Sequence, residues 1–144
     1  MKQAYDFTMQ ITEDDGFKHY LQGILNDYHK TVYPRMEVPK SKKYSFHVTD
    51  GKGSVVGGAL IWVYWNWLEI SLIALEKEVR GNGLGRQLMA MIEEKARQEN
   101  CKWSRVETFE NELGFYQKMG YRIVGHLEDY PQGHHYYWMR KDLQ

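Results

Sequence analysis

The sequence predicts a single mixed domain of the α/β (α+β) class over residues 1–144, and three observations support this prediction. A chain of 144 residues has the length of one domain and can bury a sizeable core. Stretches of alternating apolar residues and stretches of helical spacing follow one another in the order β-α-β-β-β-α-β-α-β-β. No internal repeat, low-complexity tract or linker interrupts this order.

The first elements are a strand, a helix and a loop. Residues 3–11 alternate loosely between apolar and polar side chains, which predicts a strand. Thr12 and the three acidic residues after it favour a helix N-terminus. The helix should end before Pro34, and its apolar side chains recur at helical spacing: Phe17, Tyr20, Leu21, Ile24, Leu25 and Tyr28. Residues 34–43 are basic, contain two prolines and predict a loop.

Three strands are predicted next, over residues 44–49, 55–65 and 67–75. Residues 50–53 have the composition of a hairpin turn, and Asn66 suits the turn that follows. Aromatic residues cluster near the tip of the second hairpin, namely Trp62, Tyr64, Trp65 and Trp67. We expect most of them to belong to the core; the alternative is that some hold a cationic amine against their rings.

The second half begins with a glycine-rich loop over residues 80–85 and a helix that extends to Asn100. A strand, a short helix, and two final strands follow, over residues 103–109, 110–119, 121–127 and 135–139. Gly120 is a typical C-terminal glycine for the short helix.

Composition limits the partners and the compartment. Lys+Arg and Asp+Glu both number 19, so the formal net charge is zero, which argues against nucleic acid or an anionic membrane as the main partner. The single cysteine, Cys101, cannot form an intramolecular disulfide. We see neither a signal-peptide pattern nor an apolar stretch of membrane-spanning length, so we expect a cytoplasmic protein.

The glycine loop predicts a phosphate site. An apolar strand, a glycine loop and a helix N-terminus together expose backbone N–H groups at the positive end of a helix dipole. A nucleoside-triphosphate loop is excluded because Arg86 and Gln87 follow Gly85, where Lys and Ser or Thr would be needed. A dinucleotide fingerprint beginning at Gly81 would need a glycine in place of Arg86.

Two motifs carry a resemblance to a known family. Arg80, Gly83 and Gly85 form an Arg-x-x-Gly-x-Gly pattern, and residues 115–121 read Phe-Tyr-Gln-Lys-Met-Gly-Tyr. These segments resemble the acyl-CoA pyrophosphate loop and the "FYxKxGF" segment of the GNAT superfamily of acetyl-CoA-dependent N-acetyltransferases. Residues 107–110 and 127–134 are similar to one bacterial branch, although Glu110 and Asn111 depart from its pattern. The resemblance extends from about Val48 to the C-terminus, and it implies a small single-domain bacterial-type member.

The resemblance implies a fold, a co-substrate and a set of contacts. The fold would be a central mixed, mostly antiparallel sheet of about seven strands flanked by about four helices. Acetyl-CoA would be the co-substrate, with no metal. A backbone N–H at Ala74 or Leu75 would face the developing oxyanion. The remaining coenzyme contacts would be Val79, Arg80, Gly81, Asn82, Gly83, Leu84, Gly85 and Arg86, mainly through the backbone, with Arg80 and Arg86 the less certain side-chain ligands.

Tyr116 and Glu69 are the candidate catalytic residues. The resemblance places Tyr116 near the thioester sulfur, where a phenol can donate a proton to the leaving thiolate. The sequence alone favours a core tyrosine of an amphipathic helix, and the resemblance reverses that preference. Glu69 lies on a strand similar to one in histone acetyltransferases, where a glutamate activates the amine. Alternation would place it on one face with Ser71, Ile73 and Leu75; the alternative is a solvent-facing glutamate.

The motifs do not identify the acceptor. We expect a small-molecule amine, attacked directly in a ternary complex, and two alternatives stay open: a non-catalytic acyl-CoA-binding sensor and a protein or peptide acetyltransferase. His134 matches the branch pattern and could contact the acceptor, whereas His134 and His135 lack the further ligand spacing of a metal site. Edge strands of such a sheet can pair, so a homodimer is also open.

Overall fold

The computed structural model describes residues 7–13, 16–37 and 40–144. It divides into two compact units, Met1–Val38 and Pro39–Gln144. The first unit contains one helix, α1 (Lys18–Val32), whose apolar side chains are exposed and of which no described residue is buried. The expectation of a single domain stays a prediction. Among the described residues, no helix is long and apolar enough to cross a membrane.

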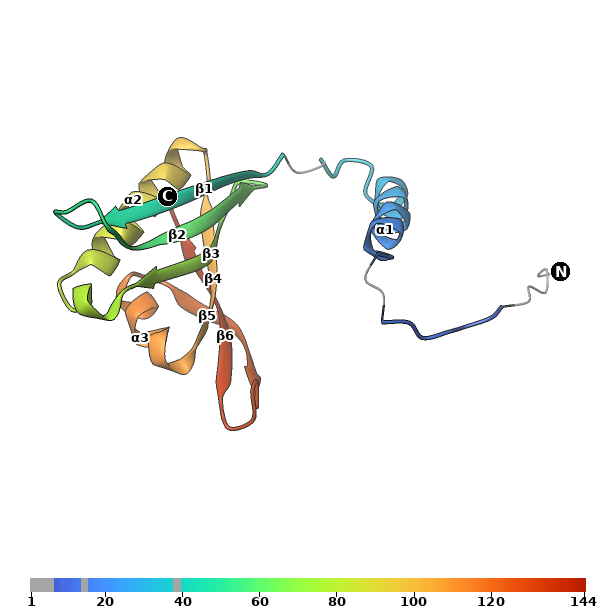
Figure 1. Cartoon of the computed structure of the whole chain (residues 1–144). Coiled ribbons are helices and arrows are strands. Elements are labelled where there is room, and N and C mark those ends of the chain that lie inside the picture. Colours follow the sequence, from blue (N-terminus) through green and yellow to red (C-terminus); the bar gives the residue numbers. More distant parts are fainter. Residues whose placement is uncertain (1–6, 14–15, 38–39) are drawn as a thin grey trace. The chain divides into compact units, whose positions relative to one another are not determined.

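The second unit contains a six-stranded mixed sheet (Figure 1). Its strands are β1 (Lys42–Thr49), β2 (Val55–Tyr64), β3 (Trp67–Leu75), β4 (Trp103–Phe109), β5 (Arg122–Glu128) and β6 (His135–Asp142). They lie in the order β1-β2-β3-β4-β6-β5, and only the β3–β4 pair is parallel. The remaining elements are the short turn η1 (Lys77–Val79) and the helices α2 (Leu84–Gln98) and α3 (Glu110–Lys118).

The α+β class is confirmed, but the element counts differ from those implied by the resemblance. The described residues contain six strands and three α-helices instead of about seven and four. Residues 7–11 of the first predicted strand form no strand, and residues 3–6 lie outside the described residues. Phe7, Met9 and Ile11 are 78%, 92% and 100% exposed. Alternation alone does not make a strand, because a strand also needs a hydrogen-bonded partner.

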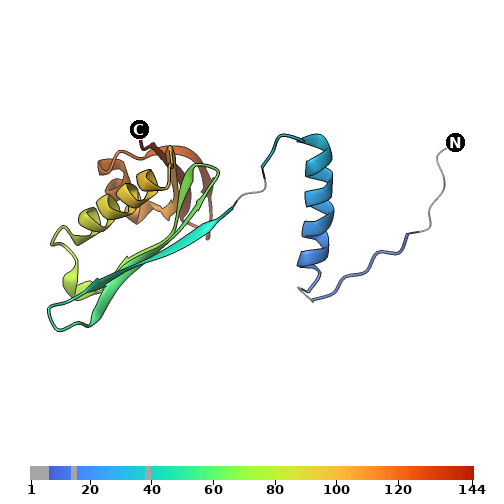
Figure 2. The same ribbon diagram turned by 90° about the horizontal axis from the view of Figure 1, so that it is seen from above.

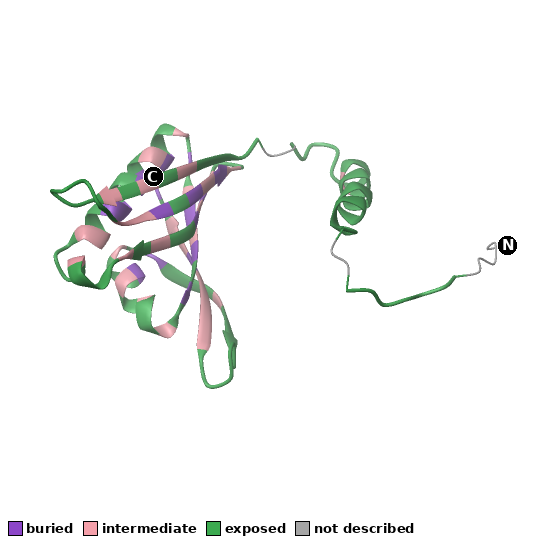
Figure 3. Ribbon diagram, in the orientation of Figure 1, coloured by how far each residue is buried: buried purple, intermediate pink, exposed green. Residues whose placement is uncertain are grey.

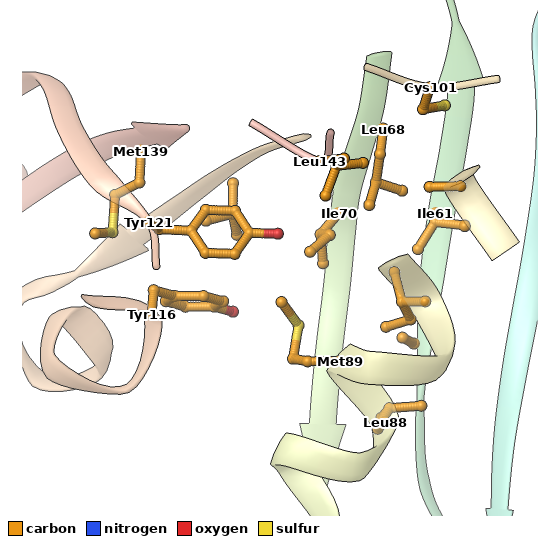
Figure 4. Close-up of a cluster of buried hydrophobic side chains, with 14 of the residues drawn as sticks. Ile61, Leu68, Ile70, Leu88, Met89, Cys101, Tyr116, Tyr121, Met139 and Leu143 are labelled. Atoms are coloured by element: carbon orange, nitrogen blue, oxygen red, sulfur yellow. The ribbon is translucent and has the colours of Figure 1, made fainter. Parts of the chain in front are cut away.

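Helices α2 and α3 pack on one face of the sheet (Figure 2) and share a core with it (Figure 4). Leu88, Met89, Ile92 and Ala96 recur at helical spacing on α2 and are all buried. They meet alternate residues of β2, β3, β4 and β6, namely Ala59, Ile61, Val63, Leu68, Ile70, Val106 and Met139. Figure 3 shows the buried residues concentrated in this second unit. The residues at helical spacing on α2 and the alternate residues of the strands therefore form the two sides of one core.

The core also encloses a carboxylate. Glu93 of α2 is 4% exposed and accepts hydrogen bonds from the Lys141 ammonium at 2.9 and 2.8 Å. Tyr121, whose hydroxyl lies 2.7 Å from the Ser104 hydroxyl, approaches the same carboxylate at 3.5 Å. A buried charge is tolerated only with such partners, so this network ties α2 to the β6 side of the sheet.

The aromatic hairpin tip is not part of the core, contrary to expectation. The buried residues of β2 are Ala59, Ile61 and Val63, so Trp62 and Tyr64 point to the opposite face. Trp65 and Asn66 occupy the turn with φ of 47° and 62°, as a two-residue hairpin turn requires. The face that each ring occupies depends on the register between paired strands, and the alternation of apolar and polar residues does not specify that register.

Candidate functional site

The loop between β3 and α2 contains two glycines in the left-handed region. Strand β3 ends at Leu75, η1 follows, and α2 begins at Leu84. Gly81 and Gly83 have φ angles of 79° and 77°. A Cβ atom added to either would meet nothing within 4 Å, so the backbone conformation, and not crowding, requires glycine here.

The first turn of α2 presents backbone amides that have no acceptor inside the helix. The first helical hydrogen bond of this turn runs from the Gln87 N–H to the Gly83 carbonyl at 3.1 Å. The amides of residues 84–86 precede it, and no described side chain caps the helix. The turn lacks acidic residues and contains Arg86. This arrangement suits a phosphate group at the positive end of the helix dipole.

Two polar side chains of the loop bond to its own backbone. Arg80 Nε donates a hydrogen bond to the Leu75 carbonyl at 2.8 Å. Asn82 Nδ2 approaches the Val79 carbonyl at 3.5 Å. The Arg80 contact holds the loop against the end of β3, and the Asn82 contact lies within the loop, so these side chains shape the loop in addition to any ligand contact.

Gly85 has little free space around it. A Cβ atom at Gly85 would lie 3.3 Å from Phe115 Cε2 and 3.9 Å from Leu75 Cδ1. Strand β3, helix α2 and helix α3 therefore meet at this residue. Tyr116 follows Phe115 on α3, with ring centroids 5.1 Å apart, so the second sequence motif lies next to the first in space.

Strands β3 and β4 pair only over their first halves (Figure 1). Residues 67–70 pair with residues 103–106. Farther along, residues 72–75 pair only with β2, and residues 107–109 only with β6, in the described sheet. The side of β3 that faces away from β2 therefore has backbone groups without a strand partner, where an extended ligand can bind as an added strand.

A bulge in β3 corrects the predicted face of Glu69. Leu60 pairs with Leu72, whereas its neighbour Ile61 pairs with Ile70, so Ser71 is an extra residue on β3. Ile70 is buried and Ile73 packs against the core, while Leu72 is 64% exposed. Glu69 pairs with Trp62 on the face opposite the core. It therefore does not share a face with Ile73 and Leu75, because one extra residue reverses the alternation.

A polar cleft of about 170 Å³ lies where β3 and β4 separate, lined by Glu69, Ile70, Ser71, Arg105, Val106, Glu107 and Tyr136. The Tyr64 hydroxyl donates to Glu69 Oε2 at 2.6 Å, and the Tyr136 hydroxyl donates to Glu107 Oε2 at 2.9 Å. Burial, followed by the hydrogen bond to Glu69, raises the pKa of Tyr64 above its ordinary value. Burial, followed by the hydrogen bond to Glu107, raises the pKa of Tyr136 to about 12. Both phenols therefore stay protonated at neutral pH.

The charges in the polar cleft do not balance. Arg105 Nη2 lies 3.1 Å from Glu107 Oε1 and 3.5 Å from Glu69 Oε2. One guanidinium thus faces two carboxylates, which leaves this cluster with a net charge of −1 when all three groups are ionised. A cationic ligand would compensate that charge.

Tyr116 is buried on the core side of the sheet. Its ring centroid lies 5.7 Å from that of Tyr121, and Figure 4 shows its hydroxyl pointing toward Met89 of α2. Burial, with a smaller contribution from the Glu112 charge, raises the pKa of Tyr116 to about 12. No hydrogen bond of its hydroxyl is found in the part of the chain that the structure describes. Tyr116 is therefore a neutral hydroxyl with no competing partner among these residues.

Three residues of the polar cleft were not predicted from sequence: Arg105, Glu107 and Tyr136. Arg105 and Glu107 occupy alternate positions of β4, and the position between them, Val106, is buried. This alternation of charged and apolar residues was the sequence signal that the two charged side chains share one face. Their proximity to Glu69 depends on the β3–β4 register, which the sequence does not show. His134 Nδ1 lies 2.8 Å from Glu110 Oε1, and the contact of His134 with the acceptor stays a prediction.

Sequence comparisons identify a matching family and two similar proteins that are named acetyltransferases. The profile of the acetyltransferase (GNAT) family matches residues 6–121. The blasticidin-S acetyltransferase of Streptomyces morookaense is 38% identical over 102 residues, which cover 69% of this chain and 75% of that protein. An acetyltransferase of Agrobacterium fabrum is 29% identical over 105 residues, covering 71% and 77%.

Solved structures share the fold. A crystal structure of an acetyltransferase from Bacillus cereus is similar with a TM-score of 0.83 and 25% identity, covering 94% of this chain and 97% of that one. An aminoglycoside 6′-N-acetyltransferase complexed with coenzyme A has a TM-score of 0.63 and 20% identity, covering 94% and 98%.

Proposed function

The chain belongs to the acetyltransferase (GNAT) family, and on that basis we propose that it transfers the acetyl group of acetyl-CoA to a primary amine of a small molecule. The observation that carries this proposal is the glycine loop that opens α2 beside the unpaired side of β3. The amine attacks the thioester directly in a ternary complex, so a C–N bond forms while the C–S bond breaks.

The loop and the unpaired half of β3 suit the two ends of the coenzyme. The pyrophosphate would contact the backbone of the loop and the first turn of α2: Val79, Arg80, Gly81, Asn82, Gly83, Leu84, Gly85 and Arg86. The pantetheine arm would bind along residues 71–75, where backbone groups lack a strand partner. A backbone N–H at Ala74 or Leu75 would then donate to the thioester carbonyl oxygen.

Tyr116 acts as the general acid in this proposal. Its raised pKa keeps the phenol protonated at neutral pH, and its hydroxyl has no partner in the described chain that would compete for the proton. Phe115 packs against the first turn of α2, which brings the helix of Tyr116 next to the coenzyme loop. Tyr116 therefore donates a proton to the departing sulfur.

Glu69 approaches the reaction from the opposite face of the sheet. It lines the polar cleft where β3 and β4 separate, while Tyr116 lies on the core side. An acetyl group in the gap between these strands would be accessible from both sides. Glu69 then removes a proton from the incoming amine, directly or through a water molecule.

The polar cleft favours a cationic acceptor. Its two carboxylates and single guanidinium attract a protonated amine, and the tyrosines beside the carboxylates offer hydrogen-bonding hydroxyls. Two proteins that resemble this chain carry antibiotic acceptors in their names, blasticidin S and an aminoglycoside. We therefore propose a small basic molecule of this type as the acceptor.

The test is release of coenzyme A thiol from acetyl-CoA in the presence of four amine classes. These are blasticidin S, an aminoglycoside, a monoamine without a second charge, and an unmodified peptide. Cys101 is 1% exposed, and burial raises the pKa of its thiol to about 11, so a thiol reagent should give little background from the folded protein. We expect the two multiply basic antibiotics to give the highest kcat/KM.

Each contrary outcome identifies an alternative. Binding of acetyl-CoA without thiol release for any amine would make the protein a sensor. Acetylation of the peptide alone would make it a protein acetyltransferase. If the monoamine without a second charge is acetylated with the same kcat/KM as the antibiotics, the polar cleft does not select cationic acceptors.

A further inference from the structure

Three potential metal ligands converge on the β5–β6 hairpin. His126 and Glu128 belong to β5, and His135 belongs to β6, directly opposite Glu128 in the strand register. One ligand atom from each side chain lies within 4.8 Å of those of the other two. His126 Nε2 and Glu128 Oε1 are 3.8 Å apart.

A tyrosine ring lies against both imidazoles. Tyr137 pairs with His126 across the strands, and their ring centroids are 5.9 Å apart at an interplanar angle of 26°. The Tyr137 ring also stacks with His135 at 6.3 Å and 23°. These contacts restrict the orientations of the two imidazoles, which lowers the entropy lost when both bind one ion.

The backbone beneath the ligands is held by hydrogen bonds. The Tyr130 N–H donates to the His134 carbonyl at 3.1 Å and closes the hairpin loop. The His135 N–H donates to Glu110 Oε2 at 3.1 Å, which fastens the start of β6 to α3. Glu128 and His135 are therefore kept opposite each other before any ion binds.

We infer that His126, Glu128 and His135 form a binding site for a first-row transition-metal dication such as Zn²⁺. Two imidazoles and one carboxylate are a donor set for Zn²⁺ and its neighbours, whereas Mg²⁺ and Ca²⁺ prefer oxygen alone. Ligand atoms around one Zn²⁺ are separated by roughly 3.3 Å for bonds near 2.0 Å, so small side-chain rotations would close the site. The side chains of His126 and Glu128 are 50% and 73% exposed, which permits those rotations and leaves room for water as a further ligand.

This site lies on the face of the sheet opposite the polar cleft. Its side chains lie on the same face as Tyr137, whereas Tyr136, between His135 and Tyr137 in sequence, points to the polar cleft. A bound ion would cross-link β5 to β6 and stabilise the hairpin that supplies Tyr136. The sequence expectation of no metal site is the opposite of this inference, and one experiment distinguishes them.

The experiment titrates tag-free, chelator-treated full-length protein with Zn²⁺ in a calorimeter and with Co²⁺ in an absorption spectrometer. We expect one equivalent of Zn²⁺, a Co²⁺ spectrum with d–d bands from nitrogen ligation, and a higher melting temperature with Zn²⁺. His126→Gln, Glu128→Gln and His135→Gln should each weaken Zn²⁺ binding at least roughly tenfold. The matched control, His47→Gln, removes an exposed histidine of β1 and should bind as the wild type does.

Three outcomes would overturn the inference. One is the absence of stoichiometric Zn²⁺ binding by the wild type. Another is unchanged affinity in His126→Gln and Glu128→Gln, each shown by circular dichroism to be folded. The third is an equal loss in His47→Gln. Because thiol release is not the readout, a failure here leaves the proposed acetyl transfer unaffected.

Discussion

At the scale of single residues, Tyr116 combines the properties of a proton donor. It is buried, burial raises the pKa of its phenol further above neutral pH, to about 12, and its hydroxyl has no partner among the described residues. Tyr121 is its natural comparison, because it is equally buried but bonds to the Ser104 hydroxyl at 2.7 Å. The first tyrosine is available for chemistry, and the second is engaged in structure.

The substitution Tyr116→Phe should lower kcat by on the order of 10²-fold with little change in the KM for acetyl-CoA, because only the proton donated to sulfur is lost. Tyr121→Phe is the control; it should reduce the urea midpoint but leave kcat near the wild-type value. Steady-state kinetics of both variants measures the difference. Equal kcat values for wild type and Tyr116→Phe would remove Tyr116 from the mechanism.

The proposed role of Glu69 as a base depends on pH. Below the pKa of the acceptor amine, a base must remove the proton, whereas at high pH the amine is already neutral. Glu69→Gln should therefore reduce kcat/KM most at low pH, with the loss shrinking as pH rises. The comparison is Glu107→Gln, which we expect to raise the acceptor KM by a similar factor at every pH because it removes charge from the polar cleft. A pH-independent loss in Glu69→Gln would contradict a base role.

At the scale of elements, the loop before α2 determines the shape of the proposed phosphate site. Gly83 has a φ of 77°, and a Cβ there would meet no atom within 4 Å. Gly53, in the turn between β1 and β2, has a φ of 82° and equally open surroundings. Both glycines need a positive φ angle, but only Gly83 lies in the proposed phosphate loop. Gly53 can therefore serve as the control for Gly83.

Gly83→Ala and Gly53→Ala should each cost about 1–2 kcal/mol of stability from the left-handed backbone. Only Gly83→Ala should also raise the KM for acetyl-CoA. The expected rise is roughly tenfold, because a strain of about 1.4 kcal/mol in the binding conformation of the loop weakens binding by that factor. Urea unfolding and thiol-release kinetics measure both effects. An equal rise in KM for the two variants would show that general destabilisation is responsible.

Strand β3 shows where prediction by pattern fails. The strand limits of residues 67–75 were predicted correctly, because its apolar, β-branched composition is local information. The extra residue at Ser71 is not visible in that composition, since it is defined by how β2 pairs with β3. Glu69 was consequently placed on the wrong face relative to Leu75.

At the scale of the whole molecule, Glu99 joins the end of α2 to the edge of the sheet. Its carboxylate accepts hydrogen bonds from Lys42 at 2.6 Å, from Tyr44, and from Lys95 at 2.9 Å. The hydrogen bond from Lys42, followed by those from Tyr44 and Lys95, lowers the pKa of Glu99 from 4.5 to about 2. The folded state therefore favours the charged carboxylate.

Because that pKa is lower in the folded state, the stabilisation by Glu99 is complete above about pH 4.5 and is lost as the pH falls toward 2. Glu99→Gln should be less stable than the wild type at pH 7, and the difference should shrink on acidification through this range. The control Glu94→Gln changes a carboxylate of the same helix that is 61% exposed and should show a much smaller difference. Urea midpoints from pH 7 to pH 3 decide; a constant difference between wild type and Glu99→Gln would contradict the coupling.

Features that depend on neighbouring residues could be predicted from the sequence. The pattern of Arg80, Gly83 and Gly85, followed by apolar residues at helical spacing, predicted a glycine loop that opens a helix, because turn conformation and helix capping are local properties. The three-dimensional structure was needed to find the separation of β3 and β4, the bulge at Ser71, the polar cleft and the His126, Glu128 and His135 cluster on the β5–β6 hairpin. Each of these depends on the register between strands that are distant in sequence, and a one-residue change in register moves a side chain to the opposite face.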